Sequence, residues 1–156
     1  MGYSIYIGEA KAGIDFYEDE VYVYPDVDIV KLDYAPSFPN DELTGNSNYR
    51  APSYSAWSDF LRCAGLHDMF FDKSEGLMRE HPGCFIINEN HLKKIQGAVK
   101  RRKEVSAKQP GFSGFSFSTG CFDEDLYDST LARLLWLEFW FQWALLNCKN
   151  PCIKNS

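Results

Sequence analysis

A cluster of polar and aromatic side chains between residues 41 and 59 is the part of the sequence best suited to bind a ligand. An arginine such as Arg50 can form two parallel hydrogen bonds with a phosphate or carboxylate. Ser53 or Ser55 at the start of a helix would add backbone N–H groups that favour an anion. The pattern predicts a site for a polar or anionic, nucleotide-like ligand or for a partner protein. The cluster comprises Asp41, Asn46, Asn48, Tyr49, Arg50, Ser53, Tyr54, Ser55, Trp57 and Asp59.

The same residues have a second, purely structural interpretation. Asparagine and serine are the usual residues of turns and helix caps, and they need no ligand to explain them. Arg50 would then pair with an acid such as Asp41 and hold the loop together. Both interpretations predict the same residue types, so the sequence leaves them open.

His81 lies in the segment Glu80-His81-Pro82-Gly83-Cys84. A histidine near a cysteine can act as the base for a thiol nucleophile. Three residues across a Pro-Gly turn do not guarantee that geometry, and Cys84 precedes an apolar run in which a cysteine is typically buried. We therefore expect His81 to contact a ligand. The alternative is a hydrolase or transferase for a phosphorylated or glycosidic substrate, whose acid–base groups come from His81, Glu80 and the carboxylates of Asp41 and Asp59.

Known cofactor and metal motifs do not fit this chain. The histidines lack metalloprotease spacing, and the glycine-rich stretch 111–120 does not end in the Lys-Ser/Thr pair of a phosphate loop. Cys148 and Cys152 are four residues apart without a second ligand pair nearby. We expect no metal and no cofactor.

Six of the 16 basic residues fall within one expected helix: Lys93, Lys94, Lys100, Arg101, Arg102 and Lys103. They could contact nucleic-acid phosphates, or they could form a solvated helix face with cations near its carboxyl end. The formal net charge of −6 favours the solvated face and makes nucleic acid a disfavoured partner.

Length and composition predict one soluble domain over residues 1–156. The chain is 45% hydrophobic and 24% charged, which excludes intrinsic disorder. Five cysteines without paired spacings do not resemble a secreted disulfide framework. Residues 1–9 lack the basic and apolar regions of a signal peptide. We expect a cytoplasmic protein with reduced thiols and no membrane association, and the oligomeric state stays open.

The pattern of residues predicts an α+β fold with a small N-terminal antiparallel sheet. Alternation at residues 3–8 and β-branched or aromatic residues at 21–24 and 27–32 indicate strands joined as hairpins within a β-rich segment 1–33. Residues 34–52 contain three prolines and three asparagines and predict one long irregular loop.

Helices dominate residues 53–147. Ser53 or Ser55 is expected to cap a helix that ends at Gly65, and Asn88 is expected to cap another. Residues 106–120 predict a second loop. The segment 126–147, capped by Asp125 or Asp128, is apolar around almost its whole circumference, which predicts a helix buried at the centre of the fold. Residues 148–156 are expected to form a tail.

Three segments resemble a family of small uncharacterised bacterial and prophage-type proteins. They are Pro52–Phe60, Gly76–Cys84 and Leu131–Trp140, with Asn155 and Ser156 at the end, so that the resemblance spans about residues 50–156. It implies a bacterial or phage setting. It brings no established activity and no catalytic residues.

Overall fold

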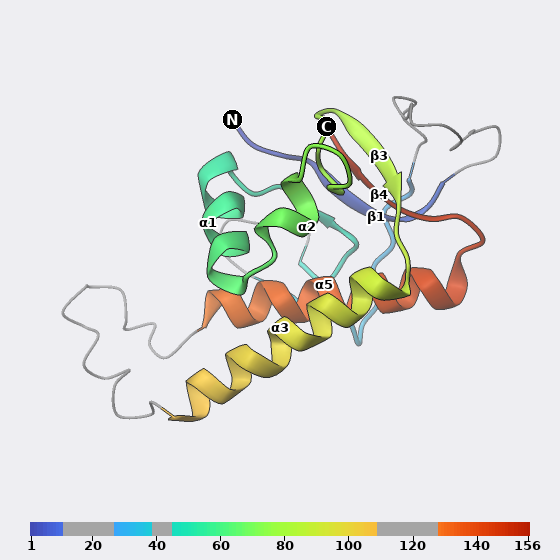
Figure 1. The fold of residues 1–156 in the computed structure, drawn as a ribbon. Coiled ribbons are helices and arrows are strands. Elements are labelled where there is room, and N and C mark those ends of the chain that lie inside the picture. Colours follow the sequence, from blue (N-terminus) through green and yellow to red (C-terminus); the bar gives the residue numbers. More distant parts are fainter. Residues whose placement is uncertain (11–26, 39–44, 109–127) are drawn as a thin grey trace.

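The computed structural model of the protein describes residues 1–10, 27–38, 45–108 and 128–156, except for the side chains of 106–108. These ranges form an antiparallel sheet with helices packed on one face (Figure 1), which confirms the α+β fold. The strands lie in the order β2-β1-β4-β3. They are β1 (Ile5–Glu9), β2 (Tyr49–Arg50), β3 (Gly83–Ile86) and β4 (Pro151–Asn155). The described helices are α1 (Tyr54–Ala64), α2 (His67–Phe71), α3 (Glu89–Lys108) and α5 (Ser129–Asn147).

Helix α5 is the central element predicted from its apolar circumference. It packs against α3, α1 and β1, and Figure 1 shows it running alongside α3 below the sheet. Trp136, Trp140 and Phe141 are fully buried within it. Asp128 caps the helix by accepting a hydrogen bond from the Leu131 amide at 3.0 Å, as one of the two expected caps. No helix in the described ranges is long and apolar enough to cross a membrane.

The predicted caps of α1 and α3 are also confirmed. The Ser53 hydroxyl accepts from the Ala56 amide at 3.2 Å, and Gly65 ends α1 in the left-handed conformation, at φ 75°, that glycine adopts without strain. The Asn88 side chain accepts from the amides of Asn90 and His91 at the start of α3. These local rules place α1 and α3 correctly because capping depends on neighbouring residues alone.

Within the described residues, the strands of the sheet come from four separate parts of the chain and not from N-terminal hairpins. Residues 27–30 form no strand, and Lys31 makes only an isolated bridge to Ser47. The reason is Asn48, whose side chain accepts from the Val30 amide at 2.8 Å and donates to the Asp28 carbonyl at 2.9 Å. This side chain therefore takes hydrogen bonds that a partner strand would otherwise provide. The expected strand at 21–24 lies outside the described residues.

Three boundaries in the irregular segments also need correction. Tyr49 and Arg50, expected in the long loop, form β2 beside β1. Residues 151–155, expected in a tail, form β4 between β1 and β3. Helix α3 continues to Lys108 where a loop from 106 was expected, and residues 109–127 lie outside the described ranges. Both short strands depend on pairing with distant residues, which a local pattern does not reveal.

Candidate functional site

The structure divides the predicted ligand-binding residues into a buried group and an exposed group. Asn48 and Arg50 are in the buried group, with 0% and 1% of their surfaces exposed. Asn48 donates to the Ile7 carbonyl at 2.8 Å, in addition to its bonds with residues 28 and 30. Arg50 donates to the Tyr49 carbonyl at 3.0 Å and lies 5.0 Å from the centre of the Trp136 ring. Both side chains are thus engaged with the protein interior.

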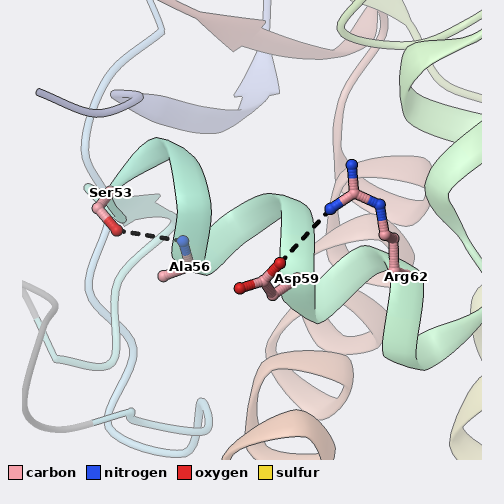
Figure 2. A network of polar contacts seen from close by, with 4 residues as sticks. All are labelled: Ser53, Ala56, Asp59 and Arg62. Carbon is pink, nitrogen blue, oxygen red and sulfur yellow. Dashed lines mark hydrogen bonds and ion pairs between the residues drawn. The ribbon is translucent and has the colours of Figure 1, made fainter.

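Three other members of the predicted cluster are also engaged within the protein. Trp57 is buried in the core, where its indole N–H contacts the Met78 sulfur at 3.2 Å. Asn46 donates to the Leu32 carbonyl. Asp59 pairs with Arg62 one turn along α1, as Figure 2 shows, at 3.4 Å. Asp41 lies outside the described residues.

Tyr54 and His81 form the exposed group, and the turn before β3 positions His81. Gly83, the first residue of β3, packs closely on this turn: a Cβ atom there would lie 2.8 Å from the Glu80 carbonyl oxygen, closer than such atoms approach. The turn directs that carbonyl toward β4, where it accepts from the Asn155 side-chain amide at 3.1 Å. His81 is thereby held at the surface, beside the edge of the sheet.

Asn155 fixes the tautomer of His81. Asn155 is fully buried, and because its Nδ2 donates to Glu80, its Oδ1 faces His81 Nδ1 at 2.5 Å. A carbonyl oxygen can only accept, so Nδ1 must carry the hydrogen. In the neutral ring, Nε2 is then the acceptor. A buried amide thus directs an unprotonated nitrogen toward the surface.

Tyr54 and Tyr3 complete the arrangement around His81. The Tyr54 hydroxyl lies 3.3 Å from His81 Nε2 and donates to it in this tautomer. That distance exceeds the usual O–H hydrogen-bond length, so the bond is weak and open to exchange with a ligand group. The Tyr3 ring packs edge-on against Tyr54 at 4.8 Å and His81 at 4.9 Å. Burial, and then the neighbouring Tyr54, raise the pKa of Tyr3, which keeps this phenol neutral.

The first turn of α1 adjoins the same surface. Figure 2 shows Ser53 at the start of the helix, with its hydroxyl directed at the Ala56 amide. The amides of Tyr54 and Ser55 belong to the first turn, where a helix offers no acceptor of its own. We call the combination of Tyr3, Ser53, Tyr54 and His81 the Tyr54–His81 surface. It presents hydroxyl, imidazole and amide groups together.

The cysteines do not contribute a nucleophile to this surface. Cys84 is fully buried as expected, and it faces Cys152 rather than His81. The hydrogen bond between the Cys152 thiol and Cys84, and then burial, raise the pKa of Cys152. Burial and the charge of Glu9 raise the pKa of Cys148 to about 11. All cysteines in the described ranges carry free thiols. Burial makes the Cys84 thiol inert, and the raised pKa values do the same for Cys148 and Cys152.

Two clefts lined by described residues lie elsewhere on the molecule. One, of about 340 Å³, lies between α2 and α3 and includes Asp68, Asp72 and His91. Hydrogen bonds from Ser74, and then from the Glu75 amide, lower the pKa of Asp72. Within the described ranges, no group of three acidic, histidine or cysteine side chains is arranged to hold a metal ion. The other cleft, of about 450 Å³, lies between α3 and α5.

Sequence reasoning missed two residues of the site, Tyr3 and Asn155. Tyr3 was assigned only to a strand, and Asn155 only to a tail. The signal for Tyr3 is its aromatic side chain at the start of the strand predicted from residue 3. Asn155 had none, because its role depends on the pairing of β4 with β3, which places it opposite Gly83.

Comparison with protein-family models, curated proteins and solved structures found no match to this chain. The geometry of the described residues therefore carries the functional argument alone. The resemblance to bacterial and prophage-type proteins stays a prediction.

Proposed function

We propose that this protein is a binding module that takes a small anionic ligand at the Tyr54–His81 surface. The single observation that supports this function is the fully buried Asn155, which holds the exposed His81 in one orientation and one tautomer. A buried amide that fixes the orientation of an exposed histidine keeps the imidazole in position to bind a ligand.

The available hydrogen-bond groups favour an anion over a neutral ligand. When His81 takes up a proton at Nε2, its Nδ1–H remains bonded to Asn155, and Nε2–H becomes a charged donor toward the surface. The Tyr54 hydroxyl then turns from His81 to the ligand. First-turn amides of α1 add donors where the helix dipole favours negative charge. A phosphate or carboxylate group satisfies all of these donors.

The enzymatic alternative has less support from the described residues. Tyr54, His81 and Asn155 have the order of a nucleophile, a base and an orienting group. The acids expected to assist are not gathered around them, since Asp59 pairs with Arg62 and Glu80 engages the site through its backbone carbonyl. Both described clefts lie away from His81. An open surface of donors favours binding.

Isothermal titration calorimetry with inorganic phosphate, a sugar phosphate and a nucleoside monophosphate tests the proposal. We expect His81→Ala to weaken binding by at least about tenfold and Tyr54→Phe by about three- to tenfold, the range for charged and neutral hydrogen bonds. His67→Ala and Tyr34→Phe, which alter a histidine and a tyrosine outside the surface, should leave affinity unchanged. Absence of binding for every probe would contradict the proposal.

A further inference from the structure

We propose that Tyr54 accepts an acyl group from an acyl phosphate, with His81 as the base that takes up the phenol proton. The inference rests on the proposed function, because the phosphate group of such a donor is the anion that the Tyr54–His81 surface would bind. It adds to binding one covalent transfer, in which the protein itself is modified. Two observations support it: a chain of polar contacts that ends on Tyr54, and the accessibility of this side chain.

Tyr54, His81 and Asn155 form a continuous chain of polar contacts from the surface to the interior. The Tyr54 hydroxyl lies 3.3 Å from His81 Nε2, and His81 Nδ1 lies 2.5 Å from Asn155 Oδ1. A nucleophile, a base and a group that orients the base have this order in sites where an imidazole activates a hydroxyl or a thiol. The contact between nucleophile and base is often long in the free protein and shortens when a reactant binds. The distance between Tyr54 and His81 is therefore compatible with proton transfer.

The position of Asn155 prepares His81 to accept a proton. Because the Asn155 side-chain oxygen can only accept, Nδ1 keeps its hydrogen, and Nε2 of the neutral ring presents a lone pair to Tyr54. The Tyr3 ring packs edge-on against both Tyr54 and His81, which restricts the rotation of the two rings. A phenol is a weak nucleophile until its proton is removed, so a base fixed beside the hydroxyl accelerates attack by Tyr54.

Tyr54 differs in this respect from three other tyrosines of the described ranges. Tyr34 is more exposed, with 72% of its surface accessible against 39% for Tyr54, but its ring contacts Phe139, which cannot take up a proton. Burial, and then a neighbouring tyrosine, raise the pKa values of Tyr3 and Tyr6, which keeps both phenols protonated. Exposure alone therefore selects Tyr34 for modification, whereas the geometry selects Tyr54.

An acyl phosphate fits this surface because it joins an electrophilic carbon to a phosphate group. The first-turn amides of α1, which belong to Tyr54 and Ser55, favour the phosphate. Tyr54 Oη attacks the carbonyl carbon, and the bond between that carbon and the phosphate oxygen breaks. The phenol proton passes to His81 Nε2 and then to the departing phosphate. The products are an O-acyl tyrosine and inorganic phosphate, so the transfer needs no oxidant or reductant.

Incubation of the protein with acetyl phosphate, followed by peptide mass spectrometry, tests the inference. We expect Tyr54 to be acetylated at least about tenfold faster than Tyr34, since a positioned base typically contributes about a hundredfold or more. In His81→Ala, acetylation of Tyr54 should be at least about tenfold slower for the same reason. The matched control His67→Ala changes a histidine outside the Tyr54–His81 surface and should keep the wild-type rate.

A second measurement does not depend on whether His81→Ala folds. Nitrogen NMR of the protein with labelled histidines should show that the hydrogen of the neutral His81 ring is on Nδ1. A hydrogen on Nε2 would overturn the inference, because no acceptor would then face the Tyr54 hydroxyl.

Three outcomes of the labelling experiment would also overturn it: equal rates at Tyr54 and Tyr34, a rate at Tyr54 that His81→Ala leaves unchanged, or an equal loss of rate in His67→Ala. Titration with inorganic phosphate separates these failures from a failure of the proposed function. Phosphate binding without faster acetylation of Tyr54 would overturn the transfer alone. Absence of phosphate binding would contradict the proposed function and, with it, the choice of an acyl phosphate as the donor.

Discussion

Two polar regions of this molecule use similar residues for opposite purposes. In the first, which we call the inner region, Asn48 and Arg50 are buried and donate hydrogen bonds to the backbone of the protein itself. In the second, the outer region, Tyr54 and His81 are exposed, and the weak hydrogen bond between them can be replaced by a bond to a ligand. The difference teaches that a polar residue indicates a ligand site only where its hydrogen-bonding groups are not already consumed by the fold.

Asn155 connects the two behaviours. Like Asn48 it is a fully buried amide, yet one of its two partners is the exposed His81 rather than the backbone. Asn155 thus links the protein interior to the exposed His81 through one hydrogen bond.

The largest effect is expected for Asn48→Ala. The substitution leaves the buried Ile7 carbonyl, and the partly buried Asp28 carbonyl and Val30 amide, without their side-chain partner, and a buried unsatisfied group costs about 1–3 kcal/mol. We expect a loss of about 3 kcal/mol in the free energy of unfolding, measured by urea denaturation. Asn147→Ala, which removes an exposed amide bonded to the Trp143 carbonyl, should cost less than about 0.5 kcal/mol.

Arg50→Lys should reduce stability without changing anion binding. Lysine cannot reproduce the planar contact with Trp136 together with the hydrogen bond to the Tyr49 carbonyl. We expect the free energy of unfolding to fall by about 1–3 kcal/mol. Calorimetry with phosphate on the folded variant should give the wild-type affinity. A variant that keeps its stability and loses affinity would reverse the roles assigned to the two regions.

Ser53→Ala tests the outer region through its helix cap. Loss of the hydroxyl that accepts from the Ala56 amide should cost about 1 kcal/mol of stability, as for other serine caps. Ser55→Ala is the matched control, since Ser53 and not Ser55 provides the cap. A larger loss in the Ser55 variant, measured by thermal denaturation, would contradict the assigned cap.

The smallest effect is expected for Asp59→Asn. Its pair with Arg62 is exposed, with 73% and 63% of the two side chains accessible, and such pairs contribute at most about 0.5 kcal/mol. The comparison is Asp128→Asn, which removes the charge that pairs with the less exposed Arg102 but keeps a residue able to cap α5. Chemical denaturation should show the larger loss in the second variant. Equal losses would mean that burial does not set the strength of these pairs.

The helices were predictable because their signals are local. Ser53, Asn88 and Asp128 cap the helices that follow them, and the apolar circumference of 131–146 correctly indicated a central helix. These features depend on residues within a few positions of one another.

The sheet and the site were harder to predict because they depend on distant residues. In the β1–β4 pair, Glu9 lies opposite Pro151, far away in the sequence. The Asn48 side chain takes the place of a strand partner for residues 28 and 30. In the site, His81 was identified by its chemistry, but Asn155 becomes visible only when β4 is placed beside β3. Composition alone likewise could not separate the buried Arg50 from the exposed Tyr54, since both are polar residues of one segment.

The position of β4 between β1 and β3 has a consequence for the synthesis of the chain. Until residues 151–155 have emerged from the ribosome, β1 and β3 each have an open edge that no other described strand fills. Open edges on partly folded chains pair readily with other chains and promote aggregation. Pairing across more than a hundred residues also makes folding slow. The nascent chain therefore exposes the open edges of β1 and β3 until β4 becomes available to pair with both.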